Sequence, residues 1–354
     1  MSPRRRKRLD PAAFQLPIEQ LKGGEFSDRY ASLAKDTLPS TRIQRRVLLQ
    51  LSARQHGWLS GIDEAIAILK VGVDDWDALA VHALYEGDVL EPWDTVLTIE
   101  GEYAAFAHFE TPILGALTHR TKVCTNVREI VEAARPKPVF FFGARDEHWS
   151  AQAGDGFAAM IGGARQVCTP AQGALWGGKV VGTIPHSLIA AFGGNTVAAT
   201  KQLATHFKED VPLLALVDYD NDCVKTSLEV ARAVGERLWG VRLDTSDNMV
   251  DRSVLPQLGT FRPTGVNPQL VWNVRNALDA EGFGDVQIVV SGGFDVDRVT
   301  EFEEEGVPVD AYGIGSAAYR GTFDFSADVV MVDGKPQARA GRSLRPNPQL
   351  EKVR

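Results

Sequence analysis

The stretch that decides the fold is Gln287-Ile288-Val289-Val290-Ser291-Gly292-Gly293-Phe294, an apolar run that ends in two glycines. A second stretch of the same kind follows it, Val309-Asp310-Ala311-Tyr312-Gly313-Ile314-Gly315-Ser316. Each apolar run predicts a buried strand, and each glycine loop marks its end. Because glycine accepts a positive φ and has no side chain, consecutive N–H groups in such loops can converge on phosphate oxygens. Either loop alone could be a simple turn, but the pair is typical of the last two strands of a phosphate-binding (β/α) barrel.

The composition is that of a globular enzyme larger than one typical domain. The chain has 354 residues, of which 44% are hydrophobic and 24% charged, so we expect two domains or one barrel with an attached layer. Its net charge of −8 argues against a nucleic-acid-binding surface. The basic run Arg4-Arg5-Arg6-Lys7-Arg8 is expected to be a solvated tail rather than a binding arm.

The sequence carries no membrane or disulfide signal. No run approaches the ~20 apolar residues that span a bilayer, and the N-terminus lacks the apolar core of a signal peptide. We therefore expect a cytoplasmic protein without a membrane partner. Cys124, Cys168 and Cys223 lie far apart and form no CxxC pair, so we expect buried thiols rather than a disulfide framework or a zinc site.

From residue 138 onward, short apolar runs alternate with helical stretches, which predicts repeated βα units. The predicted strands span residues 138–142, 164–168, 180–184, 213–217, 240–243, 287–290 and 310–314. The predicted helices between them include residues 186–206, 222–238 and 267–280. Seven strands are one fewer than the usual eight, so we expect an irregular seven-stranded α/β barrel with its active face at the strand C-terminal ends.

The two ends of the chain have a different pattern. Helices are expected at residues 41–55, 61–69 and 74–84, followed by strands around residues 88–101. Near the other end, Asp333-Gly334 between two extended stretches predicts a β-hairpin that packs back on the N-terminal layer. We therefore expect a discontinuous α/β N-terminal domain of residues 1–125, completed by 322–354, beside a barrel of residues 126–321.

Polar residues gather just past the predicted strands. They include Arg145, His186, Asp218, Asp220, Arg242 and Asp244. Cations, carboxylates and glycine N–H groups at one end of a barrel suit a phosphorylated, metal-bound substrate. The Asp218-Asp220-Asp222 series is either a carboxylate cluster facing a ribose or a magnesium pyrophosphate, or a solvated turn.

Two of these positions allow both a chemical and a structural interpretation. His186 opens a predicted helix, where a neutral imidazole could accept a phosphoryl group or merely make a local hydrogen bond. Arg242 and Asp244 are two residues apart on a strand, so they share one face. They could form a structural ion pair, or Arg242 could bind an aromatic acid.

Taken together, these segments resemble the nicotinate phosphoribosyltransferase family in its shorter archaeal and bacterial form, from about residue 16 to 342. The matching segments are Ser27-Asp28-Arg29-Tyr30, Gly61-Ile62-Asp63-Glu64-Ala65, Glu110-Thr111-Pro112-Ile113-Leu114-Gly115, Phe142-Gly143-Ala144-Arg145, Gly182-Thr183-Ile184-Pro185-His186, Val241-Arg242-Leu243-Asp244-Thr245, Ser291-Gly292-Gly293 and Gly313-Ile314-Gly315-Ser316.

The resemblance implies a type II phosphoribosyltransferase fold and a homodimer in which each N-terminal domain reaches the partner's barrel. It implies that nicotinate and phosphoribosyl pyrophosphate form nicotinate mononucleotide and pyrophosphate in NAD salvage, with ATP hydrolysis and Mg²⁺. Without a C-terminal cysteine cluster, no zinc knuckle is expected, and no metal ligand is assigned.

The resemblance also implies roles for single residues. His186 corresponds to the histidine that ATP phosphorylates, and Asp218 or Asp244 would stabilise the positive charge on the ribose. Tyr30, Thr183 and Arg242 correspond to nicotinate contacts. The expected phosphate-binding residues are Arg145, Ser291, Gly292, Gly293, Gly315 and Ser316.

Three alternatives remain open at this point. The same chemistry could act on quinolinate or nicotinamide. A nucleotide dehydrogenase barrel has similar glycine loops, but that class needs a cysteine shortly after the second loop, where this chain has Ala317-Ala318-Tyr319. A metabolite-binding regulator without turnover is the third alternative.

Overall fold

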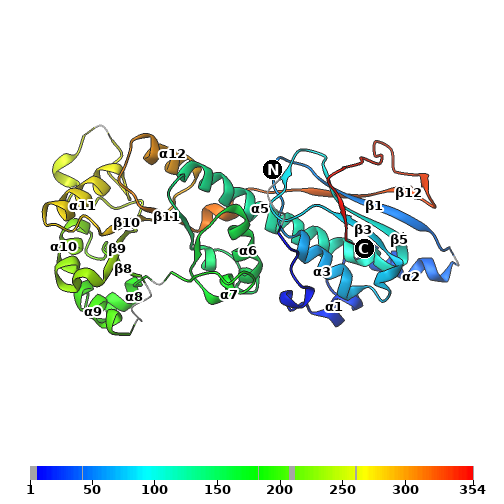
Figure 1. Cartoon of the computed structure of the whole chain (residues 1–354), viewed down its shortest axis with the longest axis horizontal. Helices are drawn as coiled ribbons and strands as arrows, with labels where there is room; N and C mark the ends of the chain where they lie inside the picture. The colour runs from blue at the N-terminus through cyan, green and yellow to red at the C-terminus, as the bar shows by residue number, and fades with distance from the viewer. Residues whose placement is uncertain (1–5, 42, 182, 207–211, 260, 354) are drawn as a thin grey trace. The chain divides into compact units, whose positions relative to one another are not determined.

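The computed structural model describes residues 6–41, 43–181, 183–206, 212–259 and 261–353 (Figure 1). Gly182 of the expected motif and Arg4-Arg5 of the basic run lie outside these residues. The chain divides into two compact units, one of Met1–Asn126 with Arg320–Arg354 and one of Val127–Tyr319.

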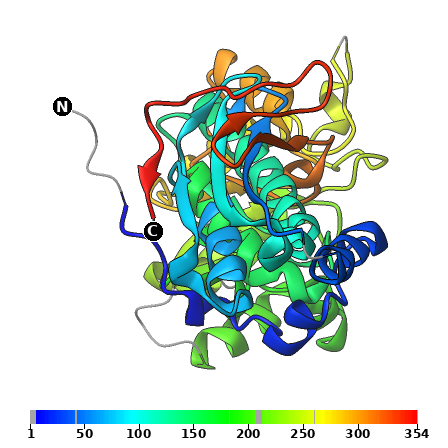
Figure 2. The ribbon, with the colours of Figure 1, turned by 90° about the vertical axis from the view of Figure 1, so that its right-hand side faces the viewer.

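The first unit is built on an antiparallel sheet with the strand order β13-β12-β1-β5-β3-β14. These strands are β1 (Arg46–Ala53), β3 (Ala80–Ala83), β5 (Thr95–Glu102), β12 (Phe325–Val332), β13 (Lys335–Pro336) and β14 (Glu351–Lys352). A small second sheet pairs β2 (Gly57–Trp58) with β4 (Val89–Leu90). Figure 2 shows the late strands, in red, beside the early ones, in blue and cyan. Segments from both ends of the chain therefore complete one sheet.

The helices of this unit are α1 (Ile18–Gly23), α2 (Arg29–Ser40), α3 (Ile62–Gly72), α4 (Tyr103–Phe106) and the start of α5 (Glu110–Ala134). Side chains of α3 and the central strands form its hydrophobic core, with Ile62, Leu69, Leu51, Leu97 and Ile99 fully buried. The expected helix at residues 61–69 is confirmed as α3. The expected hairpin is also confirmed, since Asp333 and Gly334 both have positive φ and join β12 to β13.

Two predicted helices of this unit are wrong. Residues 41–55 contain the strand β1, which pairs with both β5 and β12. Residues 74–84 contain a short 3₁₀ turn, Trp76–Ala78, and then the strand β3. A short apolar run has the same appearance in a buried strand and in a buried helix. The pairing partners that favour a strand here, β5 and β12, are distant in sequence.

The second unit contains a parallel six-stranded sheet with the order β7-β6-β11-β10-β9-β8, which confirms the α/β class. Its strands are β6 (Val139–Phe141), β7 (Gln166–Val167), β8 (Leu213–Leu216), β9 (Leu238–Leu243), β10 (Gln287–Val290) and β11 (Ala311–Ile314). Six of the seven predicted strands are therefore present. The seventh, residues 180–184, makes two isolated parallel bridges, Val180 to Val167 and Thr183 to Leu214.

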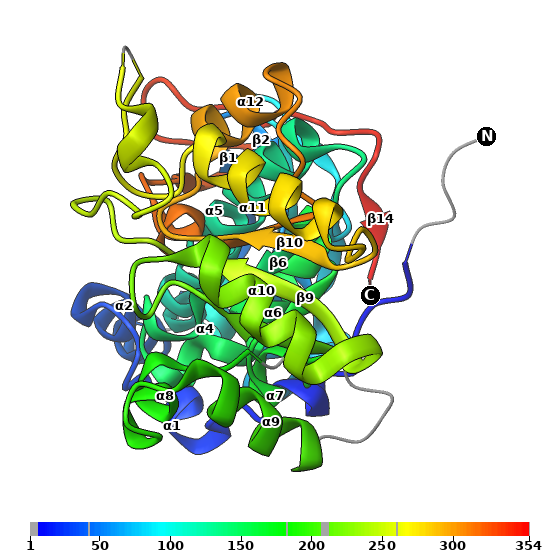
Figure 3. The same ribbon diagram turned by 90° about the vertical axis from the view of Figure 1, so that its left-hand side faces the viewer.

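The helices of this unit follow its strands. They are α6 (Gln152–Gly162), α7 (Pro170–Gly173), α8 (His186–Ala191), α9 (Thr196–His206), α10 (Cys223–Val234), α11 (Pro268–Ala280) and α12 (Val296–Glu304). Figure 3 shows α10 and α11 lying over β9 and β10. Asp222 and Asn267 cap α10 and α11 by accepting backbone N–H groups of the first turn.

The continuous helix expected at residues 186–206 is instead two helices. Gly193 and Gly194 separate α8 from α9, with φ values of 65° and 84°. This left-handed backbone ends a right-handed helix, and glycine adopts it at no steric cost. His186 is consequently the first residue of a short, separate helix.

Within the described part of the chain, no helix is both long and apolar enough to cross a membrane.

Candidate active site

A cavity of about 390 Å³ lies at the carboxyl ends of the parallel strands in Val127–Tyr319. Its lining residues are Phe142, Ala144, Arg145, Cys168, Thr183, Ile184, Pro185, His186, Ser187, Leu216, Arg242 and Asp244. The fold thus brings together five of the residues predicted from the sequence. They are Arg145, Thr183, His186, Arg242 and Asp244.

Arg242, Asp244 and Ser291 form a connected polar group on neighbouring strand ends. Arg242 Nε donates to Ser291 Oγ at 2.7 Å, and Ser291 Oγ donates to Asp244 Oδ1 at 2.6 Å. Arg242 Nη2 lies 3.2 Å from Asp244 Oδ2. All three side chains are at least half-buried, so the guanidinium is held in one orientation. Its Nη1 atom has no acceptor among the described residues, which leaves it available to a ligand.

His186, on the wall of the cavity, contacts Asp218. His186 Nε2 lies 3.0 Å from Asp218 Oδ1, and the imidazole is about half exposed while the carboxylate is nearly buried. Burial raises the pKa of Asp218, His186 opposes this shift, and the negative charge of Asp244 adds to it. When Nε2–H donates to Asp218, the other ring nitrogen, Nδ1, carries the free lone pair.

The two glycine loops are neighbours because β10 and β11 pair in parallel, with Val290 opposite Tyr312. Gly292 and Gly293 have φ values of 87° and 79°, and no acceptor among the described residues lies within reach of either N–H group. A Cβ on Gly315 would lie 2.7 Å from an Asp146 oxygen, so only glycine fits there without a shift. Ser316 follows, exposed. These loops can therefore present backbone donors to an anion.

Arg145 and Thr183 also lie where the sequence predicts, near the ends of the strands. Arg145 closes a 3₁₀ turn, Gly143–Arg145, directly after β6, and it is exposed. The Tyr319 hydroxyl donates to Gly143 O at 3.0 Å and so anchors this turn. Thr183 is half-buried and itself makes the bridge to Leu214 of β8.

Tyr30 belongs to the other compact unit, on α2, where its side chain is 62% exposed. Partial burial and the charges of Glu110 and Asp28 raise its pKa. It is not among the residues that line the cavity.

Among the other residues of the cavity wall, the sequence assigned no role to Phe142 or to Cys168. The Phe142 ring lies 5.0 Å from the guanidinium carbon of Arg242, and a Cβ on Gly313 would collide with that ring. Its place at the end of a predicted strand was an available signal. Cys168 Sγ donates to Gln172 Oε1 at 3.3 Å, and burial raises the pKa of its thiol. No sequence signal distinguished this cysteine from the other two.

The described residues include no cluster of three His, Cys, Asp or Glu side chains that could hold a metal ion alone. Mg²⁺ is usually held by one or two carboxylates together with substrate oxygens. Asp218 and Asp244, close enough for their charges to interact, fit that arrangement.

The sequence and the fold of this chain are similar to those of several known proteins. Residues 35–121 match the model for the quinolinate phosphoribosyl transferase N-terminal domain. The structure is similar to that of nicotinate-nucleotide pyrophosphorylase from Pyrococcus furiosus, with a TM-score of 0.80 and 34% identity over 93% of this chain and 81% of that chain. It is also similar in fold to human nicotinic acid phosphoribosyltransferase, with a TM-score of 0.68 and 20% identity over 90% of this chain and 77% of that one.

Curated relatives include nicotinate phosphoribosyltransferase pncB1 of Mycobacterium tuberculosis, 29% identical over 76% of this chain and 57% of that protein. The enzyme of Bacillus subtilis is 24% identical over 66% of this chain and 44% of its own length. The chain thus spans about half the length of these curated relatives.

The fold is that of the type II phosphoribosyltransferases. Within that class, the chain belongs to the nicotinate phosphoribosyltransferase family.

Proposed function

We propose that this protein is a nicotinate phosphoribosyltransferase, which forms nicotinate mononucleotide and pyrophosphate from nicotinate and phosphoribosyl pyrophosphate in NAD salvage. The observation that carries the proposal is Arg242. Its guanidinium is fixed by Ser291 and Asp244 in a cavity beside the two glycine loops, and Nη1 has no acceptor among the described residues.

A fixed guanidinium suits a carboxylate on an aromatic ring. Arginine binds carboxylates through charge-assisted hydrogen bonds, and the neighbouring Phe142 ring offers an apolar wall for a pyridine. Thr183, on the same cavity wall, is a second contact for the base. The base would therefore lie with its carboxylate toward Arg242.

The N–H groups of Gly292 and Gly293, with Gly315 and Ser316 beside them, are the proposed site of the 5′-phosphate. Ser291 would act here by joining this loop to Arg242, because its hydroxyl is already used by Arg242 and Asp244. Arg145, exposed at the cavity edge, is the proposed partner of the pyrophosphate.

The main requirement of this reaction is that the protein positions its two substrates. The ring nitrogen of nicotinate forms a bond to the anomeric carbon of the ribose while the bond to pyrophosphate breaks, so no strong base is needed. Asp218 and Asp244 would stabilise the positive charge that develops on the ribose. They are also the residues that would hold a Mg²⁺ ion accompanying the pyrophosphate, and such an ion offsets negative charge on the leaving group.

We propose that ATP acts through His186. With Nε2–H donated to Asp218, Nδ1 would attack the γ-phosphorus of ATP, forming an N–P bond as the bond to the ADP oxygen breaks. Attack of water on the phosphohistidine then returns the imidazole and releases phosphate. Asp218 would stabilise the charged imidazole in the interval.

Two further features of the family extend the proposal. The bridges of Val180 to β7 and of Thr183 to β8 support a seventh strand that closes an irregular barrel. The exposure of Tyr30 supports a homodimer with shared active sites, in which this ring contacts nicotinate bound by the partner.

Quinolinate is the second candidate base, because the matching family model is described as a quinolinate phosphoribosyl transferase domain. Quinolinate carries two carboxylates and requires a denser cationic pocket. The lining has two arginines, of which Arg242 is already paired with Asp244. This charge balance favours the monocarboxylate.

The test supplies the purified protein with phosphoribosyl pyrophosphate, Mg²⁺, ATP and one base at a time. We expect turnover with nicotinate and far less with quinolinate or nicotinamide. Turnover of quinolinate without any nicotinate activity would overturn the proposal, and nicotinate binding without any product would point to a regulator.

A further inference from the structure

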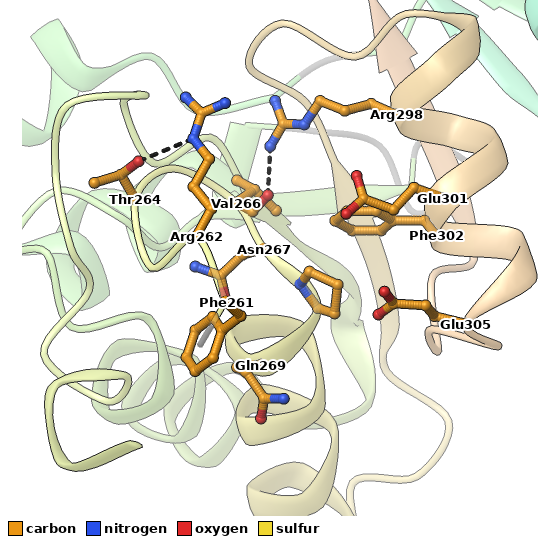
Figure 4. A pocket seen from close by; sticks show the side chains of 11 residues that line it. Phe261, Arg262, Thr264, Val266, Asn267, Gln269, Arg298, Glu301, Phe302 and Glu305 are labelled. Carbon is orange, nitrogen blue, oxygen red and sulfur yellow. Dashed lines mark hydrogen bonds between the residues drawn. The ribbon is translucent and has the colours of Figure 1, made fainter. Parts of the chain in front are cut away.

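A second cavity, of about 130 Å³, lies between the loop before α11 and the helix α12 (Figure 4). Two arginines line it. Arg262 comes from the loop and donates to Thr264 Oγ1 at 3.2 Å, whereas Arg298 comes from α12 and donates to the carbonyl oxygen of Val266. The two therefore share a cavity but have different partners.

Arg298 also reaches the first glycine loop. Its Nη1 donates to the carbonyl oxygen of Gly292 at 2.8 Å, and its guanidinium carbon lies 4.4 Å from the centre of the Phe294 ring. Its backbone N–H is held by the N-cap residue Asp295 at 3.1 Å. Asp247 Oδ1, 3.7 Å away, balances the charge. Arg298 is thus fixed at both ends and connects α12, the loop at Val266 and the glycine loop.

This contact determines the orientation of one peptide group. The C=O of Gly292 and the N–H of Gly293 belong to the same planar trans peptide and point in opposite directions. Two consecutive glycines would otherwise allow that peptide to rotate over a wide range. A donor that holds the carbonyl on one side therefore directs the N–H of Gly293 to the other side, where no protein acceptor is described.

We propose that Arg298 is a positioning residue for phosphoribosyl pyrophosphate, which acts by orienting the Gly293 N–H toward the 5′-phosphate without touching the substrate itself. The proposal rests on the proposed function, since it takes the Gly292–Gly293 loop as the phosphate site. Through Arg298, the helix α12 would contribute to substrate binding, and none of the expected site residues lies on this helix.

The test measures binding of phosphoribosyl pyrophosphate with Mg²⁺ by calorimetry, without any base, and then the KM for each substrate. Arg298→Met is expected to weaken phosphoribosyl pyrophosphate binding about tenfold or more and to raise its KM in proportion, the size of one lost charge-supported contact. The KM for nicotinate should change little. Arg298→Lys, which keeps a cationic donor group, should bind phosphoribosyl pyrophosphate with an affinity between those of Arg298→Met and the wild type.

Arg262→Met is the matched control. It removes a guanidinium from the same cavity, and Arg262 makes its hydrogen bond to Thr264 rather than to the glycine loop. It should bind phosphoribosyl pyrophosphate as the wild type does. Unchanged binding in both Arg298 variants would overturn the proposal, as would equal weakening by Arg262→Met. If Arg298→Met does not fold, Arg298→Lys decides alone. A wild type that binds phosphoribosyl pyrophosphate but does not turn over nicotinate would overturn the proposed function and leave this test intact.

Discussion

At the scale of single residues, Ser291 links the two halves of the site. Its hydroxyl accepts from Arg242 and donates to Asp244, and its backbone begins the first glycine loop. Ser291→Ala removes both hydrogen bonds but keeps the backbone. We expect the KM for nicotinate to rise by about fivefold, which corresponds to one net hydrogen bond of about 1 kcal/mol.

Steady-state kinetics with nicotinate varied at saturating phosphoribosyl pyrophosphate would measure this change. Ser246→Ala is the control, because Ser246 lies in the loop after β9 and its hydroxyl bonds only to Asn248 among the described residues. An unchanged KM for nicotinate in Ser291→Ala would show that Arg242 does not depend on this hydroxyl.

His186 provides the second prediction at this scale. His186→Asn removes the nitrogen that would carry the phosphoryl group while keeping a polar side chain near Asp218. We expect ATP consumption and ATP stimulation to disappear, while slow basal transfer to nicotinate persists. Release of ADP, followed beside product formation, measures both effects.

His206→Asn serves as the control for this variant, since His206 is exposed at the end of α9. It should consume ATP as the wild type does. ATP hydrolysis at the wild-type rate in His186→Asn would refute the phosphohistidine assignment.

The sequence predicts single residues well where a local rule applies. Arg242 and Asp244, two apart on a strand, share a face as expected and lie 3.2 Å apart. The role of the Ser291 hydroxyl was not predictable, because it depends on the register of β10 against β9. Arg298 was missed for a similar reason, since its partner Val266 lies on another segment.

At the scale of elements, the start of α3 depends on a carboxylate from outside the helix. Gly61 is its N-cap, so Glu86 accepts the N–H groups of Gly61 and Asp63 instead, at 3.1 and 3.0 Å. Burial, followed by the charge of Asp63, raises the pKa of Glu86 from 4.5 to about 7. Between pH 4.5 and about pH 7, Glu86 therefore carries a proton in the folded protein but not in the unfolded chain.

This difference predicts a pH dependence of stability. The contribution of Glu86 is fully present below its unfolded pKa and is lost as pH rises through its folded pKa. Between about pH 5 and pH 8, the free energy of unfolding should fall by about 2 kcal/mol more in the wild type than in Glu86→Gln, which does not titrate.

Urea unfolding at both pH values measures this difference. Glu102→Gln, at an exposed glutamate, is the control and should follow the wild type. The same pH dependence in Glu86→Gln and in the wild type would contradict the assignment.

Secondary-structure elements were predicted unevenly. The βα rhythm gave six strands of the parallel sheet, because each is a short apolar run followed by a polar or glycine end. In contrast, the local pattern of β1 and β3 predicts helices, because their strand character comes from pairing with β5 and, for β1, with β12. The break between α8 and α9 coincides with Gly193-Gly194, a glycine pair that is a local signal for the end of a helix.

At the scale of the whole molecule, distant segments meet to form each functional part. The two glycine loops are adjacent only because β10 and β11 pair, and Arg242 joins them because β9 is the next strand. The order of these motifs along the chain identified the family. The contacts between their side chains required the folded structure.

The central claim is that Arg242 selects nicotinate for transfer to phosphoribosyl pyrophosphate. The most direct test measures formation of nicotinate mononucleotide by the wild type, by Arg242→Met, and by Arg232→Met, whose guanidinium forms a surface pair with Glu281. We expect kcat/KM for nicotinate to fall by about a hundredfold or more in Arg242→Met, and Arg232→Met to match the wild type. Equal activity of Arg242→Met and the wild type, or no nicotinate mononucleotide from the wild type itself, would contradict the claim.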